Sequence, residues 1–323
     1  MREIYRMTED EAYETFKALR WPDGVPTCPS CGCKHSWELV KDRKWKCKEK
    51  SCRTQFTVTS KTPLASRKLE FKDILAAIAT FANGVNGVAS LRTSRELDVS
   101  YKTAFVLQHK IREALGIHDD GEQLEGEVEI DGAFMGTRKV RLPNAIPNKK
   151  DWLEYIKKHP KKHTSLVVLR ERPSPNGTSR GRIRTIHTPN EGASIPFIRK
   201  NVKKGTVLQA DFGGQWEGLT LLYKMKRINH SEAFSKDGAC TNLAESFFSR
   251  VRAAERGVYK YWTKAYVEKY GAELAWREEN ARVSNGQQIK LITEKVMQSG
   301  PSSMKGYWQR HNPKKGAVLN TIF

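Results

Sequence analysis

Apolar residues in the first third of the chain recur every three or four positions, which is the spacing of one face of a helix. This pattern predicts an amphipathic helix over residues 69–82 and two more over 88–97 and 101–115, with Ser100 as the N-cap of the last. A short turn joins the latter two helices. Their spacing favours a helix-turn-helix, although an ordinary helical hairpin shows the same pattern.

From residue 121 onwards, apolar and polar residues alternate instead, which predicts strands. The predicted strands are 127–134, 164–170, 182–187 and 206–210, with a helix at 193–202 before the last of them. A Pro-Ser-Pro-Asn-Gly turn favours an antiparallel pairing of the second and third strands. Helices are predicted at 241–255, 264–281 and 289–298. This order of three strands, helix, strand and helix is that of an RNase H-like domain.

Length and composition limit the classes of protein that fit. A chain of 323 residues has room for two or three domains. No apolar run approaches the roughly 18 residues that a membrane span needs, so we expect no membrane association. The N-terminus is acidic and amphipathic and lacks the features of a secretion signal. These two features of the sequence predict a cytoplasmic protein.

The net charge of the chain indicates what kind of molecule it binds. Lys and Arg number 57 against 36 Asp and Glu, and the net charge of +21 favours a polyanion. Residues 132–210 hold 18 basic and four acidic residues, so most of the excess lies there. Such a run can simply keep a surface solvated. Its lysine pairs alternate with aromatic residues, however, which suits binding of a nucleic-acid backbone. The lysines selected as DNA contacts are Lys157, Lys158, Lys161 and Lys162.

Five of the six cysteines fall within 25 residues, which is not the distribution of a disulfide framework. Two closely spaced pairs can bind one tetrahedral Zn²⁺ in a zinc ribbon of about residues 25–60, with Trp37 and Trp45 covering its small core. The predicted ligands are Cys28, Cys31, Cys47 and Cys52. Cys33 could replace Cys31, and reduced cysteines without metal are the alternative.

Three carboxylates lie where strands end or a helix begins. Asp131 and Asp211 stand at the ends of two predicted strands, and Glu245 lies one turn into a helix, 34 residues after Asp211. Carboxylates that converge in this way can bind two divalent cations for in-line attack on a phosphodiester. Each acid alone could be a turn residue or a solvated side chain. Together they predict a site for two Mg²⁺ ions, with Mn²⁺ as a substitute.

Five strings carry a resemblance to a known family. They are CPSCG…C…CRTQFTVTSKTPL, VEIDGAFMG, LQADFGGQW, CTNLAESFFSRVRAAERGV and EKYGAELAWREENAR, and they span the chain from about Thr27 to Arg282. The chain resembles bacterial insertion-sequence transposases with an N-terminal zinc ribbon and an ISXO-type DDE domain of RNase H-like fold. The resemblance implies that Asp131, Asp211 and Glu245 are the metal-binding acids and that Arg252 holds substrate phosphate.

Two positions depart from that family. Cys240 stands where relatives often carry a histidine, and Tyr259-Lys260 replaces a common His-His pair. Tyr259 and Lys260 could contact DNA, and packing is the alternative for Tyr259. Asn242 and His230 are candidates for orienting the acids, against a plain structural role. Trp216 is expected to be a core or base-stacking residue.

The prediction is therefore a multidomain α+β protein with a small zinc ribbon, a helical helix-turn-helix segment and an RNase H-like α/β catalytic domain. The predicted segments are an N-terminal helix (1–24), the zinc ribbon (25–60), the helix-turn-helix segment (61–120), the catalytic domain (121–285) and a basic C-terminal tail (286–323). In the helix-turn-helix, the candidate DNA contacts are Tyr101, Lys102, Gln108 and Lys110.

The expected activity is that of a DNA transposase, which binds the terminal inverted repeats of its element and catalyses metal-dependent cleavage and transfer of a 3′-OH into target DNA. Pairing two DNA ends implies a homodimer or a higher oligomer, and such a protein would be associated with the nucleoid. A DNA-binding regulator with an inactive RNase H-like domain is the alternative, and a nuclease or resolvase that cuts without joining is another.

Overall fold

The structure is a computed structural model that describes residues 2–117, 121–135, 154, 165–173, 181–212, 214–228, 240–260 and 262–307. The chain divides into two compact units. The ribbon unit comprises Met1–Ile117 and Val283–Phe323, and the sheet unit comprises His118–Arg282. The division into five segments at residues 24, 60, 120 and 285 stays a prediction.

The ribbon unit is built mainly of helices. They are α1 (Arg2–Arg6), α2 (Glu9–Arg20), α3 (Phe71–Asn83), α4 (Ser90–Glu96), α5 (Tyr101–Leu115) and α10 (Asn285–Gln298). Helix α10 packs against α2, α3 and α5 and buries Ile292, Val296 and Met297 completely. The first part of the segment predicted as a basic tail is thus a core helix. None of the helices in the described part of the chain is both long and apolar enough to span a bilayer.

Helix starts in this unit are capped by side chains. Thr8 and Glu11 form a capping box at the start of α2, and Ser100 caps α5 by accepting a hydrogen bond from Thr103 N, as its position predicts. Helix α3 is capped from a distance, because the carboxylate of Glu9 accepts hydrogen bonds from Phe71 N and Lys72 N, each at 2.9 Å. This contact fastens the start of α2 to the start of α3.

A three-stranded antiparallel sheet follows α2. Its strands are β1 (Ser36–Leu39), β2 (Lys44–Cys47) and β3 (Gln55–Phe56), with a 3-10 turn at Val40–Asp42. Trp45 is buried between Trp21 and Phe56, with ring centroids 4.9 and 6.0 Å away. Trp37 is 44% exposed, so the prediction that it covers this core is wrong. Trp37 pairs with Lys46 and Trp45 with Glu38, which places the two tryptophans on opposite faces. Trp21 of the preceding segment fills the core instead.

The sheet unit contains one mixed five-stranded sheet. Its strands are β4 (Glu127–Phe134), β5 (Ser165–Glu171), β6 (Ile183–Thr188), β7 (Val207–Asp211) and β8 (Lys224–Ile228), in the order β6-β5-β4-β7-β8. Strands β4, β5 and β6 are antiparallel, and β7 runs parallel to β4 and β8. Four strands confirm the predicted ones within about one residue at each end. Strand β8 was not predicted, because three of its five residues are charged.

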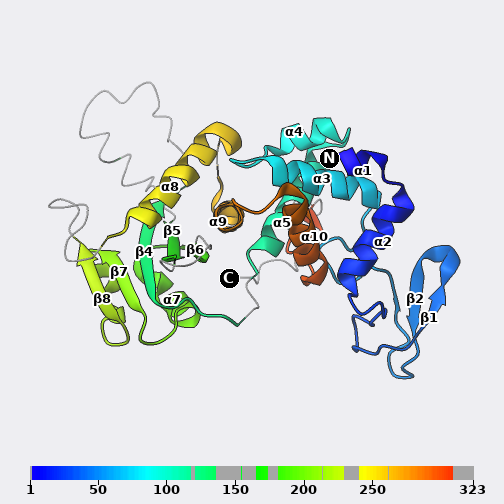
Figure 1. Ribbon diagram of the computed structural model, residues 1–323, viewed down its shortest axis with the longest axis horizontal. Coiled ribbons are helices and arrows are strands. Elements are labelled where there is room, and N and C mark those ends of the chain that lie inside the picture. Colours follow the sequence, from blue (N-terminus) through cyan, green and yellow to red (C-terminus); the bar gives the residue numbers. More distant parts are fainter. Residues whose placement is uncertain are drawn as a thin grey trace. The chain divides into compact units, whose positions relative to one another are not determined.

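The helices of this unit lie on both faces of the sheet (Figure 1). They are the 3-10 turn η2 (Glu191–Ser194) leading into α7 (Ile195–Asn201), the 3-10 turn η3 (Gly214–Leu219), α8 (Asn242–Ala254), and α9 (Val267–Glu279). A π-helical turn at Glu255–Tyr259 and a 3-10 turn at Lys264–Tyr266 connect α8 to α9.

One apolar core lies on each face of this sheet. Val128, Ile130, Leu208 and Ala210 pack with Ile198 and Trp216 on the α7 face, whereas Ala133 and Leu166 pack with residues of α8 and α9 on the other. Side chains alternate between faces along a strand. Glu127, Glu129 and Asp131 of β4, together with Gln209 of β7, therefore share the α8 face. A row of polar groups thus runs beneath the start of α8.

Candidate active site and cysteine cluster

The two predicted catalytic aspartates lie on neighbouring strands. Ile130 of β4 is paired in register with Ala210 of β7, so Asp131 and Asp211 follow side by side on parallel strands. Strand alternation puts Asp131 on the face that α8 covers, whereas Asp211, the last residue of β7, accepts a hydrogen bond from Trp216 of the α7-face core. Glu245 lies in the first turn of α8, where its backbone N donates to Thr241 O at 2.9 Å and its Oε1 accepts from Thr241 Oγ1 at 3.2 Å. The sheet and one helix thus bring the three acids towards one another.

The surroundings of Asp131 are acidic. Burial, together with the charges of Asp211, Glu191 and Glu245, raises the pKa of Asp131 to about 7, against one hydrogen bond from Gly132 N at 2.7 Å. Among the described residues, the charges with the largest effect on it are carboxylates. Its ionised form is therefore costly until a cation is near.

Glu191 is a fourth carboxylate at this position, which the sequence analysis missed. It begins η2, and a Cβ added to Gly132 would collide with its carboxylate, so its side chain lies directly over the residue after Asp131. Burial, then the charge of Asp211, raises the pKa of Glu191. No periodicity in the sequence marks it, because only the fold brings η2 to β4.

Asp211 is oriented by the turn that follows it. Trp216 Nε1 donates to Asp211 Oδ1 at 3.1 Å, and Gln215 Nε2 is 3.4 Å from the same oxygen. Trp216 is completely buried, as the core interpretation expected. Its indole nitrogen nevertheless fixes the carboxylate, a role that the sequence did not reveal.

The other residues predicted around the acids have different surroundings. Arg252 is exposed on α8, and Asn242 is exposed at the start of that helix. Tyr259 packs 4.5 Å from the Tyr270 ring and against the α8 core, which matches the packing alternative. Lys260 is exposed, and its Nζ donates to Arg256 O at 3.2 Å. Cys240 N donates to Gln209 Oε1 at 2.8 Å, so this residue contributes its backbone.

Several predicted contacts lie outside the described residues. These are Lys157, Lys158, Lys161, Lys162 and His230. Most of the basic stretch between residues 138 and 180 lies outside them as well. Their roles stay predictions from the sequence.

The predicted DNA contacts of α5 are accessible only in part. Tyr101 is 54% exposed, and exposed Lys102 lines a groove of about 610 Å³ beside the segment Leu64–Leu69. Lys110 lines the same groove, and burial lowers its pKa. Gln108 is 1% exposed and donates to Thr93 Oγ1 at 2.7 Å, so its assignment as a DNA contact is wrong. It ties α5 to α4 instead.

The four predicted zinc ligands form a compact group. The Sγ atoms of Cys28, Cys31, Cys47 and Cys52 all lie within 4.8 Å of one another. Cys33 lies outside the group, and its Sγ is 3.4 Å from His35 N. Burial raises the pKa of Cys47 to about 12, and hydrogen bonds with Thr54 lower that of Cys52 to about 6. Four sulfur ligands at such separations suit one tetrahedral Zn²⁺, which would stabilise all four thiolates.

The acids are not gathered to the same degree. Among the described His, Cys, Asp and Glu side chains, the cysteines are the group whose ligand atoms come so close together. Asp131, Asp211 and Glu245 are neighbours by charge and by strand register but do not form such a group. The two candidate metal sites therefore differ in how far the protein alone assembles them.

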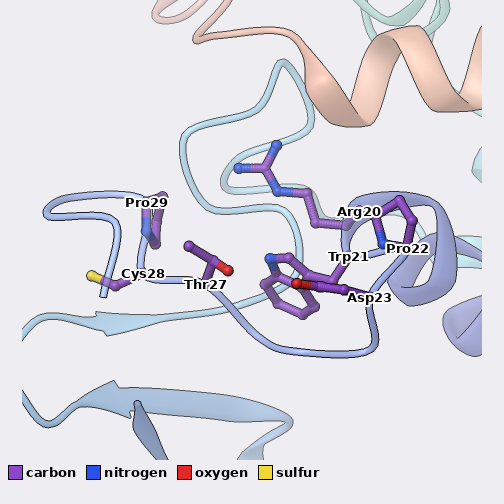
Figure 2. Close-up of a pocket in the computed structure, with 7 residues that line it drawn as sticks. All are labelled: Arg20, Trp21, Pro22, Asp23, Thr27, Cys28 and Pro29. Carbon is purple, nitrogen blue, oxygen red and sulfur yellow. The ribbon is translucent and has the colours of Figure 1, made fainter. Parts of the chain in front are cut away.

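A pocket of about 440 Å³ lies beside the cysteine cluster (Figure 2). Figure 2 shows Arg20, Trp21 and Asp23 at one end and Cys28 and Pro29 at the other, with Thr27 between them. Trp21 also packs on Trp45, so the pocket borders the small core of the ribbon. It lies in the ribbon unit and contains none of the predicted catalytic acids.

Comparison with protein families assigns both regions. Residues 123–279 match the ISXO2-like transposase domain, and residues 7–55 match the transposase zinc-ribbon domain. The first match contains all three acids and the second all four cysteines. Comparisons with curated proteins and with solved structures gave no match.

Proposed function

Because the chain belongs to the insertion-sequence transposases with an N-terminal zinc ribbon and an ISXO2-like domain, we propose that it cleaves and joins the DNA ends of its own element. It binds the terminal inverted repeats, hydrolyses a phosphodiester to free a 3′-OH, and transfers that 3′-OH into target DNA. One site performs both reactions, because only the nucleophile changes.

One observation carries this proposal. The transposase match spans the three acids, and the sheet places Asp131 and Asp211 side by side beneath the helix that bears Glu245. In chain order, three antiparallel strands are followed by α7 and by two parallel strands, β7 and β8, before the helix with the third acid. That order supports the RNase H-like fold expected from the sequence.

The acids fit divalent cations. Asp131 is buried near other carboxylates, and burial together with their charges raises its pKa, so a bound cation would stabilise its ionised form. Mg²⁺ and Mn²⁺ prefer carboxylate oxygens of this kind. We assign the binding to Asp131, Asp211 and Glu245. When bound, two such ions would activate the attacking oxygen and stabilise the leaving one.

The surrounding residues orient the acids and the substrate. Trp216 holds Asp211 by its hydrogen bond, and Thr241 holds Glu245. Arg252 follows Glu245 by seven residues, so it lies two turns along the same face of α8 and is exposed to receive a DNA phosphate. Asn242 lies at the first turn of that helix, where it can support the position of Glu245.

The ribbon unit supplies recognition of the DNA ends in this proposal. In it, the zinc ribbon and the helix pair α4–α5, acting as a helix-turn-helix, contact the repeats, with exposed Tyr101 and Lys102 available to DNA. The lysines at 157, 158, 161 and 162, together with Lys260, bind phosphates without selecting the sequence. Pairing two ends requires at least two copies of the chain.

A joining assay tests the proposal. Labelled oligonucleotides carrying the element's terminal repeats are incubated with plasmid and Mg²⁺, and the products are separated as joined, cut or unchanged. We expect joined product, and we expect D131N, D211N and E245Q to lose cutting and joining while keeping end binding. The matched control is E217Q, because Glu217 is an exposed acid of the same unit that pairs with Arg227.

The products also distinguish the alternatives. Cut product without joining identifies a nuclease or resolvase, and end binding without either identifies a regulator. Cutting retained by any of the three acid variants would contradict the assignment of the site.

A further inference from the structure

Glu129 is a charged residue with no exposed surface, two positions before Asp131 on the same face of β4. Its Oε2 accepts hydrogen bonds from Leu243 N at 2.9 Å and Ala244 N at 3.0 Å, and its Oε1 accepts one from Arg172 Nε at 2.9 Å. A buried carboxylate is tolerated only when it is fully paired, and this one is. Both of its oxygens are therefore occupied by the protein itself.

The two backbone donors are the second and third N–H groups of α8, which lie in its first turn and have no acceptor within the helix. The N-cap residue Thr241 does not cap the helix with its own side chain, which donates to Glu245 instead. Glu129 thus supplies the cap from a strand 114 residues away in sequence. A carboxylate is favourable there because it also meets the positive end of the helix dipole.

Neighbouring side chains complete this anchor. Arg172, already paired with Glu129, donates to Cys240 O at 3.3 Å and to Glu127 Oε2 at 3.3 Å. Gln209 of β7 donates to Glu127 Oε2 and accepts from Cys240 N, both at 2.8 Å. Residues 240–244 are therefore tied to β4 and β7, and to Arg172 directly after β5. We call Glu127, Glu129, Arg172 and Gln209 the α8 anchor.

The α8 anchor holds the helix that carries Glu245, and so affects where this acid lies relative to the two aspartates. The strand ladder fixes Asp131 against Asp211, whereas Glu245 belongs to a helix and is placed by whatever holds that helix. Glu129 is two residues from Asp131 on a strand, and its hydrogen-bond donors are one and two residues from Glu245. Glu129 thus connects the strand of the first acid to the helix turn of the third.

We propose that Glu129 is a positioning residue that sets the Glu245 carboxylate at the separation from Asp131 and Asp211 that a divalent cation needs. This inference rests on the proposed function, since it assumes that these acids bind the cation. Glu129 itself is not a ligand, because its oxygens already accept three hydrogen bonds.

The test compares E129Q with wild type in the full-length, zinc-loaded protein, using Mn²⁺ as the probe. Mn²⁺ binding is measured by electron paramagnetic resonance, and hydrogen exchange is measured on the peptide containing Leu243 and Ala244. Glutamine keeps the shape but loses the charge, so we expect faster exchange in that peptide and a Kd for Mn²⁺ raised about tenfold or more. Cleavage should fall and be partly restored by excess Mn²⁺, which a loss of folding alone would not permit.

The chain offers a matched control. Glu9 caps α3 in the ribbon unit with the same pair of backbone bonds that Glu129 gives to α8. E9Q should therefore loosen a helix start without changing the Kd for Mn²⁺. If E129Q does not fold, E129D replaces it, because the shorter acid keeps the charge and changes only the reach. We expect E129D to weaken Mn²⁺ binding as well.

The outcomes separate the two proposals. Wild-type exchange or wild-type Mn²⁺ affinity in a folded Glu129 variant, alongside loss of affinity in E245Q, would overturn the positioning role alone. Mn²⁺ binding to wild type that is unaffected by D131N and E245Q would overturn the proposed metal site, and with it the inference.

Discussion

The cysteine cluster and the carboxylate cluster are assembled in different ways. The four Sγ atoms come from two turns within 25 residues and already lie within 4.8 Å of one another. The acids come from two strands and a helix, and they are brought near one another by the sheet, the α8 anchor and the Trp216 hydrogen bond. In the ribbon, the metal is part of the fold. In the sheet unit, protein interactions place the ligands first.

Because of this difference, we expect metal loss and ligand removal to affect the stability of the two units in different ways. The ribbon has a small core of Trp21, Trp45 and Phe56, so we expect it to need its metal to fold. The sheet unit has two apolar cores of its own and bears the cost of holding carboxylates together. Loss of the metal should therefore unfold the ribbon. Removal of one of the acids should instead stabilise the sheet unit and abolish its catalytic activity.

The largest effect is expected from C47S. Loss of one thiolate removes most of a zinc affinity that, in small zinc domains, is about 10–16 kcal/mol. The ribbon should unfold, zinc content should fall from one equivalent, and binding to the terminal repeats should be lost. Metal analysis, circular dichroism and gel shifts measure the three effects.

The matched control for this prediction is C33S. Cys33 lies between the predicted ligands in sequence but outside the group of four in space. C33S should keep one zinc and bind DNA as wild type does. Loss of zinc in C33S, or its retention in C47S, would show that the ligand set is different.

The next effect concerns pH. The pKa of Asp131 is raised to about 7 in the folded state, so the protonated form contributes stability at low pH that is lost as pH rises from about 4 to about 7. Without Mg²⁺ or Mn²⁺, D131N should be more stable than wild type above pH 7, by up to about 4 kcal/mol. Urea unfolding of both proteins between pH 5 and 8 measures the difference.

The difference in free energy of unfolding between D131N and wild type does not include the titration of the cysteines, because both proteins have the same cysteine cluster. Added Mn²⁺ should stabilise wild type at pH 7.5 and leave D131N nearly unchanged. Stability curves that stay parallel across the whole pH range would contradict the assignment of an unfavourable buried charge to Asp131.

A smaller effect is expected from neutralising Lys157, Lys158, Lys161 and Lys162 to glutamine. If each lysine binds one phosphate, the slope of log Kobs against log salt should decrease by up to about 3.6. Affinity should fall for all DNA sequences alike, because phosphate contacts do not select bases. Fluorescence anisotropy at several salt concentrations measures the slope, and a change in which repeat is preferred would place recognition in the sheet unit.

The smallest effect is expected from W216F. Phenylalanine keeps most of the buried ring but cannot donate the hydrogen bond to Asp211, so Mn²⁺ affinity should fall about three- to tenfold. W262F is the control, because Trp262 is equally buried in the opposite core, stacks on Tyr270, and makes no hydrogen bond through its Nε1 within the described part of the chain. Equal losses of Mn²⁺ affinity in both variants would show that packing, rather than the hydrogen bond, sets the position of Asp211.

The sequence predicted the parts of the fold that local patterns encode. Four of the strands and the helices α3, α5 and α8 follow from alternation, helical spacing and a cap at Ser100. The four cysteines and three acids follow from residue chemistry at turns and strand ends. Strand β8 escaped prediction because its charges mask the alternation.

What the sequence could not show depends on distant partners. Glu129 has the same local pattern as Asp131, and only its contacts with α8 give it a different role. Glu191 becomes a neighbour of the acids because η2 folds over Gly132. Trp37 is exposed and Trp45 is buried because the pairing of β1 with β2 puts them on opposite faces of the small sheet. In each case, the deciding contact joins residues that no short window contains.

The close approach of Glu191 to Gly132 has a consequence for how homologous sequences can diverge. A side chain at 132 would displace the Glu191 carboxylate from its place beside the first aspartate, so glycine at 132 keeps that place open. The two positions should therefore covary. Lineages that gain a side chain after the first aspartate should carry a smaller residue at 191, and lineages that keep the glutamate should keep the glycine.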